Sequence, residues 1–215
     1  MNYMKVYKLI IFDCDGTLVD SEPLTNGLVA LMIRENGIEM SKSKALDLFA
    51  GKTLSDITNF IKSHGVDINE VTFEKEYRER CLTIFQRELK AIPGVHDLLS
   101  SLEIPYCIAS NGPKVKMDVT LPASNLSQYF TEETIFSAYD VQAWKPKPDL
   151  FLHAANIMGY RPEETLVIED TWSGAMGAIN AKMDVWLYNP HLDNRVYLDA
   201  VPNFSSIAHI RKKLV

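Results

Sequence analysis

The chain has 215 residues, a length that suits one large domain or one domain with an inserted module. Its 47% hydrophobic and 23% charged residues are ordinary for a globular protein, and no internal repeat or low-complexity segment is present. The formal net charge of −6 argues against nucleic acid as the main partner, because a phosphate backbone requires a basic footprint.

No apolar run is long enough to span a bilayer, and residues 1–8 lack a signal-peptide pattern, so we expect no membrane partner. The three cysteines, Cys14, Cys81 and Cys107, lie far apart and are odd in number. We therefore expect reduced thiols and a cytoplasmic location. We also expect a monomer or a weak dimer.

The first predicted element is a buried parallel strand over the apolar run 9–12. Asp13, Asp15, Gly16 and Thr17 follow it. Extended geometry directs both carboxylates to one side at the carboxyl end of the strand, where open α/β sheets bind ligands, and directs Cys14 into the core. Two carboxylates this close repel, so a divalent cation, a shared proton or both must compensate. Taken alone, the run also fits a surface turn or a calcium loop.

A helical block follows the first strand. Ser21 and Pro23 indicate a helix start, and Leu24, Leu28, Leu31 and Met32 continue it at helical spacing. Further helices are predicted over 43–49, 54–64 and 73–89. Because no strand is evident between Val19 and Ala91, we expect an inserted helical cap at 20–90.

From Pro93 onward, strands alternate with helices, which predicts an α/β fold with a doubly wound parallel sheet. We expect strands at 106–109, 135–137, 165–168 and 185–187. We expect helices at 95–102, 114–126 (broken or capped near Pro122), 149–158 and 173–181, and a short basic helix from Ile207. Residues 1–19 and 91–215 would then form the catalytic core.

Polar side chains follow several of these strands, and parallel strands bring such residues to one edge. Besides the first two acids, they are Ser110-Asn111, Lys145 and Glu169-Asp170. Each group also has a plainer interpretation: a turn for the first, a solvated loop lysine for the second and helix capping for the third. Oxygen ligands of this kind suit Mg²⁺, and no Cys/His spacing supports zinc.

Four short motifs occur in the order D-x-D-G-T, S-N, K-P-x-P and E-D. This series resembles the four motifs of the haloacid dehalogenase-like hydrolase superfamily and covers nearly the whole chain. The helical insert resembles the mobile cap of the subfamily that includes β-phosphoglucomutase and phosphoglycolate phosphatase.

The resemblance implies the catalytic and metal-binding roles. Asp13 would be the nucleophile that attacks phosphorus, and Asp15 the general acid and base. Asp13, the backbone carbonyl of Asp15, and Asp170 would bind Mg²⁺, with Glu169 acting directly or through water. Lys145 would pair with Asp13 and neutralise phosphate charge, and its bond to Pro146 would be cis.

The resemblance also implies the substrate contacts. Ser110 and amides near Asn111 would hold phosphate oxygens, and Thr17 is a further expected contact. Gly51-Lys52-Thr53 resembles the end of a P-loop, but Leu46 stands where that motif needs glycine, so we reject ATP binding. By resemblance Lys52 lies on a cap loop and contacts a second anionic group; a solvated surface lysine is an equally good interpretation.

Three departures from the family pattern narrow the function. Thr25 stands where the mutases carry histidine, which disfavours a mutase, and the presence of Asp15 disfavours a dehalogenase. Lys182 stands where a glycine usually ends the helix after the fourth motif, and a left-handed residue there would cost on the order of 1 kcal/mol. A non-catalytic regulator is disfavoured because every catalytic residue is present.

We therefore predict a Mg²⁺-dependent phosphomonoesterase that forms an aspartyl-phosphate, with a β-phosphoglucomutase-like mutase as the alternative. Residues 110–117 and the stretch from Ser137 to Pro146 resemble the bacterial 6-phosphogluconate phosphatases. The expected substrate is a small sugar phosphate or sugar-acid phosphate, with 6-phosphogluconate as one candidate.

Overall fold

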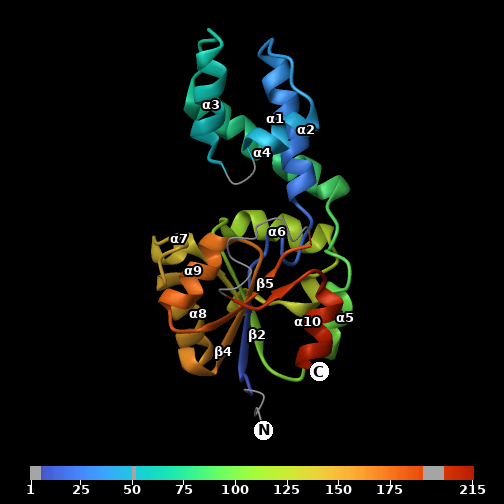
Figure 1. Cartoon of the computed structure of the whole chain (residues 1–215), viewed down its shortest axis with the longest axis vertical. Helices are drawn as coiled ribbons and strands as arrows, with labels where there is room; N and C mark the ends of the chain where they lie inside the picture. Colours follow the sequence, from blue (N-terminus) through green and yellow to red (C-terminus); the bar gives the residue numbers. More distant parts are fainter. Residues whose placement is uncertain (1–5, 50–51, 191–200) are drawn as a thin grey trace. The chain divides into compact units, whose positions relative to one another are not determined.

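The computed structural model describes residues 6–49, 52–190 and 201–215 (Figure 1). Gly51, expected on the cap loop, lies outside these ranges. The contacts divide the chain into two compact units, one formed by residues 1–20 and 90–215 and the other by residues 21–89. Each unit is described by itself.

The larger unit contains a six-stranded, all-parallel sheet in the order β3-β2-β1-β4-β5-β6. This confirms the predicted fold class. The strands are β1 (Leu9–Phe12), β2 (Tyr106–Ser110), β3 (Ile135–Ser137), β4 (Thr165–Glu169), β5 (Asp184–Tyr188) and β6 (Asn203–Phe204). Strand β6 was not expected, because two residues are too few to produce a sequence pattern. The polar residues of the first, second and fourth motifs therefore lie at the carboxyl ends of β1, β2 and β4.

Helices cover both faces of the sheet: α8 (Asp149–Met158) and α9 (Trp172–Asn180) on one face, α5 (Val95–Ser101) and α10 (Ile207–Leu214) on the other (Figure 1). Leu9 and Ile11 belong to the core cluster that includes α8 and α9, whereas Ile10 and Phe12 are equally inaccessible to solvent. This two-sided burial explains why β1 is apolar throughout.

The remaining elements of this unit are short or lie near the sheet edge. They are α6 (Lys114–Ala123), α7 (Ala138–Val141) and the 3₁₀ helices η1 (Ser127–Tyr129), η2 (Glu132–Thr134) and η3 (Pro162–Glu164). Pro122 lies in the last turn of α6, which ends one residue later rather than continuing to Leu126.

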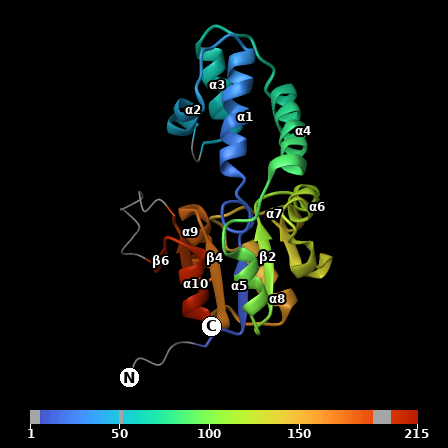
Figure 2. The same cartoon turned by 90° about the vertical axis from the view of Figure 1, so that its right-hand side faces the viewer.

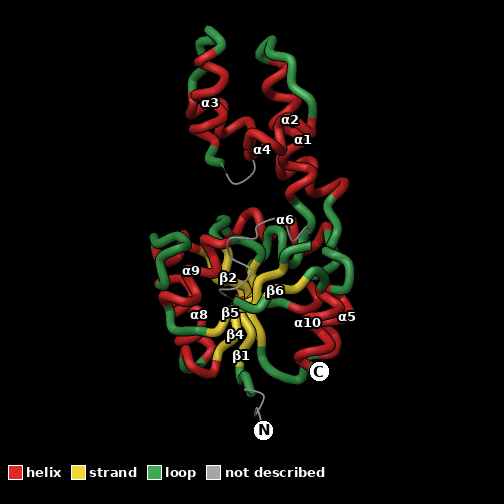
Figure 3. Tube along the Cα trace, in the orientation of Figure 1, coloured by secondary structure: helices red, strands yellow, loops and turns green. Residues whose placement is uncertain are grey.

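The smaller unit has only helices and loops among its described residues (Figures 2 and 3). Its helices are α1 (Glu22–Glu35), α2 (Lys42–Phe49), α3 (Leu54–Ser63) and α4 (Glu70–Glu88). Helix α1 packs on α2 and α4, and Arg80 of α4 pairs with Glu35 of α1 at 2.7 Å. Thr53 and Asp56 form a capping box at the start of α3, and Asn69 caps α4.

Helix α1 begins where the sequence predicted, but the expected capping by Ser21 was wrong. Ser21 occupies the N-cap position, but its side chain makes no capping hydrogen bond because its backbone is already helical. Leu31 is 40% exposed, so the buried stripe of α1 runs through Leu28 and Met32 without it. Within the described residues, no helix has the length and apolar character needed to cross a membrane.

Candidate active site

The site is built around the turn that follows β1. The amide of Asp13 donates to the carbonyl of Ile168 at 2.9 Å, so strand-like pairing with β4 extends one residue beyond β1. Asp13 is buried at the end of this strand. Cys14 faces the core, as expected, and burial raises the pKa of its thiol well above the usual value. It therefore stays a protonated packing residue.

Gly16 lets Asp170 approach this turn. Its φ of 79° lies in the left-handed region, and a Cβ built on it would lie 2.0 Å from Oδ2 of Asp170. Thr17 is fully buried, and its hydroxyl donates to Oδ1 of Asp170 at 3.2 Å. The Thr17 side chain, expected to contact substrate, thus orients a carboxylate.

Asp13, Glu169 and Asp170 form a carboxylate cluster in which one oxygen from each residue lies within 4.8 Å of the others. The Asp15 side chain is not a member. Three negatively charged oxygen donors at this spacing suit a hard divalent cation such as Mg²⁺. The donor set therefore fits the metal that the sequence led us to expect.

Glu169 is the most completely bonded of the three acids. Its Oε2 accepts from the amides of Asp170 and Thr171 and from the Thr171 hydroxyl, at 2.7–2.9 Å. These bonds place the carboxylate at the N-terminus of α9, where the helix dipole favours negative charge. Gly174 makes room for it, because a Cβ there would lie 1.8 Å from Oε1 of Glu169. These hydrogen bonds and the close approach to Gly174 fix the position of the Glu169 carboxylate.

Lys145 connects the first and fourth motifs. Its buried ammonium donates to Oδ1 of Asp13 in a very short contact and to Oε1 of Glu169 at 2.8 Å. The Lys145–Pro146 peptide bond is cis, as expected. The Lys145 amide donates to Oδ1 of Asn111 at 2.9 Å, which joins the second motif to the third. Asn111 thus holds the lysine backbone.

Burial and charge shift the pKa values within the cluster. Loss of solvent raises the pKa of Asp13 to about 7, against the opposing attraction of Lys145. Loss of solvent, with repulsion from Glu169 and Asp13, raises the pKa of Asp170 well above its usual range. Burial lowers the pKa of Lys145, but attraction to Asp13 and Glu169 outweighs this and raises it overall. Lys145 therefore stays protonated in this cluster.

The second motif forms a compact polar loop after β2. Ser110 is buried, and its hydroxyl accepts from the amide of Gly112 at 3.0 Å. The Ser137 hydroxyl, at the end of β3, donates to the Gly112 carbonyl at 2.7 Å. A Cβ on Gly112 would lie 3.9 Å from Oδ2 of Asp15, so this loop lies beside the β1 turn. Phosphate binding by this loop, which the resemblance implied, stays a prediction.

Sequence reasoning did not assign a role to Lys116, in the first turn of α6. Its ammonium donates to Oδ2 of Asp15 at 2.6 Å. A signal was available in the charge count, because Lys145 alone leaves four site carboxylates poorly compensated. With Lys116 included, two negative charges remain when all these groups are ionised, which a divalent cation would balance.

Lys52 lies in the helical unit and lines a polar pocket of about 200 Å³ there. Thr25, Asn26 and Glu22 of α1 and Tyr77 of α4 also line it. Lys52 therefore lies at a pocket that is formed by residues of the helical unit.

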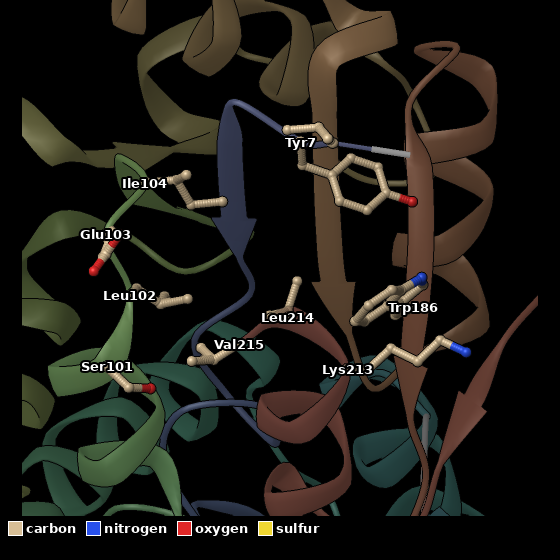
Figure 4. Close-up of a pocket in the computed structure, with 10 residues that line it drawn as sticks. Tyr7, Ser101, Leu102, Glu103, Ile104, Trp186, Lys213, Leu214 and Val215 are labelled. Atoms are coloured by element: carbon tan, nitrogen blue, oxygen red, sulfur yellow. The ribbon is translucent and has the colours of Figure 1, made fainter. Parts of the chain in front are cut away.

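A cavity of about 590 Å³ lies away from the carboxylate cluster, near the amino ends of β1 and β2. Figure 4 shows Tyr7 and Trp186 on one side of it and Leu102 and Ile104 on the other. The Tyr7 hydroxyl donates to Asp184 at 2.8 Å. No residue of the four motifs lines this cavity, so we place the chemistry at the carboxylate cluster.

Comparisons with known proteins bear on the family and the fold. The family model described as haloacid dehalogenase-like hydrolase matches residues 10–188. A 6-phosphogluconate phosphatase from Escherichia coli K12 is 37% identical over 191 residues, covering 87% of this chain and 86% of the relative. Hexitol phosphatase A from the same organism is 28% identical, covering 86% and 85%.

Among solved structures, a haloacid dehalogenase-like protein of unknown function from Agrobacterium tumefaciens superposes with a TM-score of 0.82. It is 32% identical and covers 96% of each chain. The resemblance to the bacterial 6-phosphogluconate phosphatases, expected from two core stretches, is confirmed over most of the chain.

Proposed function

The chain belongs to the haloacid dehalogenase-like hydrolase family, and from this premise we propose that it is a Mg²⁺-dependent phosphomonoesterase acting on a small phosphorylated metabolite. One observation carries the proposal: the Lys145 ammonium lies between Asp13 and Glu169 within the carboxylate cluster. This arrangement joins a buried carboxylate nucleophile to a fixed cation beside a cluster suited to a metal.

Asp13 and Asp170, with the backbone carbonyl of Asp15, would hold the metal. Glu169 accepts hydrogen bonds from Lys145, Asp170 and Thr171, which favours contact with the metal through water rather than directly. When bound, Mg²⁺ would screen phosphoryl charge from the attacking carboxylate and stabilise charge in the transition state.

The chain's own residues supply the nucleophile and the proton. A carboxylate oxygen of Asp13 attacks phosphorus while the ester P–O bond breaks, and the leaving oxygen takes a proton from Asp15. Asp15, now a carboxylate, accepts a proton from water as that water attacks the aspartyl-phosphate. The P–O bond to Asp13 breaks, inorganic phosphate leaves, and both carboxyl groups return to their starting states.

The phosphate would be bound by Ser110, by amides of the loop near Asn111, and by Lys145. Backbone amides and a lysine together counter the charge of a phosphate dianion. The amide of Thr17 is a further contact that we propose, since its side chain is directed to Asp170.

The substrate class rests on the relatives. One is named for 6-phosphogluconate and another for a hexitol phosphate, so we propose a sugar phosphate or sugar-acid phosphate, with 6-phosphogluconate tested first. Residues 20–90 would act as a cap that recognises the group attached to the phosphate. The cap pocket lined by Lys52 is the proposed recognition site for that group.

We further propose that the enzyme works in the cytoplasm as a monomer or weak dimer. The three cysteines are buried and none forms a disulfide, which is compatible with a reducing compartment. Light scattering coupled to gel filtration would measure the molecular mass against the 24.3 kDa of one chain.

The test of function is phosphate release from p-nitrophenyl phosphate, 6-phosphogluconate and a panel of sugar phosphates, with Mg²⁺ or with EDTA. We expect release that requires Mg²⁺ and disappears in Asp13→Asn, which keeps the shape of the side chain but removes the nucleophile. Interconversion of a phosphosugar without phosphate release would instead indicate the mutase alternative. A folded, Mg²⁺-supplied wild type that turns over no substrate in the panel would contradict both.

A further inference from the structure

We propose that Lys116 is the positioning residue for the proton donor, holding Asp15 by one carboxylate oxygen so that the transferable proton is carried on the other. The proposal rests on the phosphatase function above. It concerns a residue that belongs to none of the four motifs.

The contact itself is the first observation. The Lys116 ammonium donates to Oδ2 of Asp15 at 2.6 Å, across 101 positions of sequence. The two side chains are only 25% and 31% exposed, whereas surface pairs such as Lys75–Glu79 are exposed to 77% and 67%. The shielded pair resists competition from water more strongly than an exposed one.

The path of the lysine side chain is the second observation. Gly112 has no side chain, and Cδ of Lys116 lies 3.4 Å from the point where a Cβ would be. The hydroxyl of Ser110 lies 3.4 Å from the same point. The stem of Lys116 therefore runs past the phosphate-binding loop to reach Asp15, so its position is set by the same loop that would bind the phosphate.

The position of the proton follows from hydrogen-bond chemistry. An ammonium group only donates, so the oxygen that it contacts must accept. Oδ2 of Asp15 is that acceptor, and a proton on this carboxyl group is then carried by Oδ1. Fixing one oxygen also fixes the rotation of the carboxyl group, which aligns the donor with the leaving oxygen.

The consequence is a dependence on the leaving group. An alkyl phosphate such as 6-phosphogluconate expels a poor leaving group that needs a proton, whereas p-nitrophenyl phosphate expels a stable phenolate that does not. Because kcat/KM reports the steps up to the first irreversible one, it isolates transfer to Asp13 and the departure of this group. A misoriented donor should therefore harm one substrate far more than the other.

The experiment measures kcat/KM for 6-phosphogluconate, or the alkyl phosphate that wild type prefers, and for p-nitrophenyl phosphate. General acid catalysis contributes roughly 10²- to 10⁴-fold, so for Lys116→Met we expect a loss of about 10- to 100-fold on the alkyl phosphate. The loss on p-nitrophenyl phosphate should stay below about threefold. Lys116→Arg, which keeps a cationic donor, should recover most of the alkyl phosphate activity.

Lys114→Met is the matched control. Lys114 begins the same helix but pairs with Asp140 at 3.1 Å and has a side chain 51% exposed. It should behave as wild type on both substrates. Circular dichroism and thermal unfolding check that each variant is folded, and Lys116→Gln replaces Lys116→Met if the latter is not.

A double variant tests whether Lys116 acts through Asp15. In the Asp15→Asn background, Lys116→Met should cause little further loss on the alkyl phosphate. Additive losses, or equal losses on both substrates, would mean that Lys116 binds phosphate or supports the fold, and would overturn the proposal. An unchanged Lys116→Met would overturn it as well. Absence of wild-type turnover would instead count against the phosphatase function.

Discussion

At the scale of single residues, two positions of the site require glycine, because a carboxylate group occupies the space that a Cβ atom would fill. Gly16 admits Asp170 and Gly174 admits Glu169. The two acids at the carboxyl end of β4 therefore depend on backbone that lies outside their own strand. An alanine at either position would force a carboxylate to move or the backbone to shift.

Gly174→Ala tests this packing. We expect a loss of roughly 1–3 kcal/mol in the free energy of unfolding and a strong loss of phosphatase activity, because the new Cβ would overlap the Glu169 carboxylate. Urea denaturation measures the first quantity. Gly27→Ala, within α1, is the control: its Cβ would meet only the flexible end of Lys42, so helix propensity should make it neutral or more stable. Equal effects of the two changes would contradict the explanation.

The raised pKa of Asp13 gives a prediction about pH and metal. Its pKa is about 7 when folded, against 3.8 ordinarily, so the folded state binds more protons between these values. Without metal, this group makes the protein less stable as the pH rises from about 4 to about 7. Mg²⁺ binds the ionised form of Asp13. Below pH 7, the affinity for Mg²⁺ should therefore increase roughly tenfold for each unit of rise in pH and each proton that the metal displaces.

The measurement is the shift in melting temperature on adding Mg²⁺ to metal-free protein. We expect a larger shift at pH 8 than at pH 6, and a strongly reduced shift at both in Asp13→Asn. Asp170 has a pKa raised for similar reasons and changes the shift in the same direction. A shift that is independent of pH would show that no proton is displaced when the metal binds.

At the scale of elements, the end of α9 has an unusual residue in a regular motif. Lys182 has a φ of 61°, its amide donates to Ile179, and the amide of Met183 donates to Ala178. These two bonds form a Schellman motif, whose left-handed position favours glycine. Lys182, which stands where the family usually has glycine, therefore adopts the left-handed conformation, and the Schellman motif is kept.

Lys182→Gly should therefore stabilise the protein by about 0.5–1 kcal/mol, because the left-handed backbone penalises a Cβ. The exposed lysine side chain offers little to lose. Lys182→Ala is the control, since it removes the charge but keeps the Cβ, and it should give no such gain. If alanine and glycine stabilise equally in urea denaturation, charge rather than backbone strain is the cause.

Most elements could be predicted from the sequence because their patterns are local. The strand at 135–137 and the helix at 149–158 have the predicted bounds, since apolar periodicity and flanking turns define both. Helix α7 was missed although Ser137 and Asp140 form a readable capping box, because only four residues follow the signal. Strand β6 has no comparable signal.

The site was predictable to the extent that motif spacing encodes it. The motif residues meet at the carboxyl end of the sheet because parallel strands must bring them there. The Lys116–Asp15 pair could not be predicted from motif spacing. It depends on the direction of a side chain in the first turn of α6 and on Gly112, which has no side chain to block it. Side-chain direction in a short turn is not encoded by strand order.

At the scale of the whole molecule, the open question is how the inserted helical unit contributes to specificity. Lys52→Ala should raise KM roughly tenfold for 6-phosphogluconate, whose carboxylate offers a second anionic group, and much less for a hexitol phosphate, which has no anionic group besides the phosphate. Lys62→Ala is the control, because Lys62 lies in the same unit and pairs with Glu70 at 2.6 Å. Equal KM values for wild type and Lys52→Ala would leave Lys52 as a solvated surface lysine.

The central place of β1 has a consequence for how the protein is made on the ribosome. Ile10 pairs with Tyr106 and with Leu166, so the first strand to be synthesised finds its neighbours only about 100 and 150 residues later. Asp13 emerges early, but Lys145, which donates to it, and Glu169, to which Lys145 also donates, are translated much later. A nascent or truncated chain therefore carries the nucleophile without the groups that activate it. We expect such a chain to gain phosphatase activity only after β4 has been synthesised.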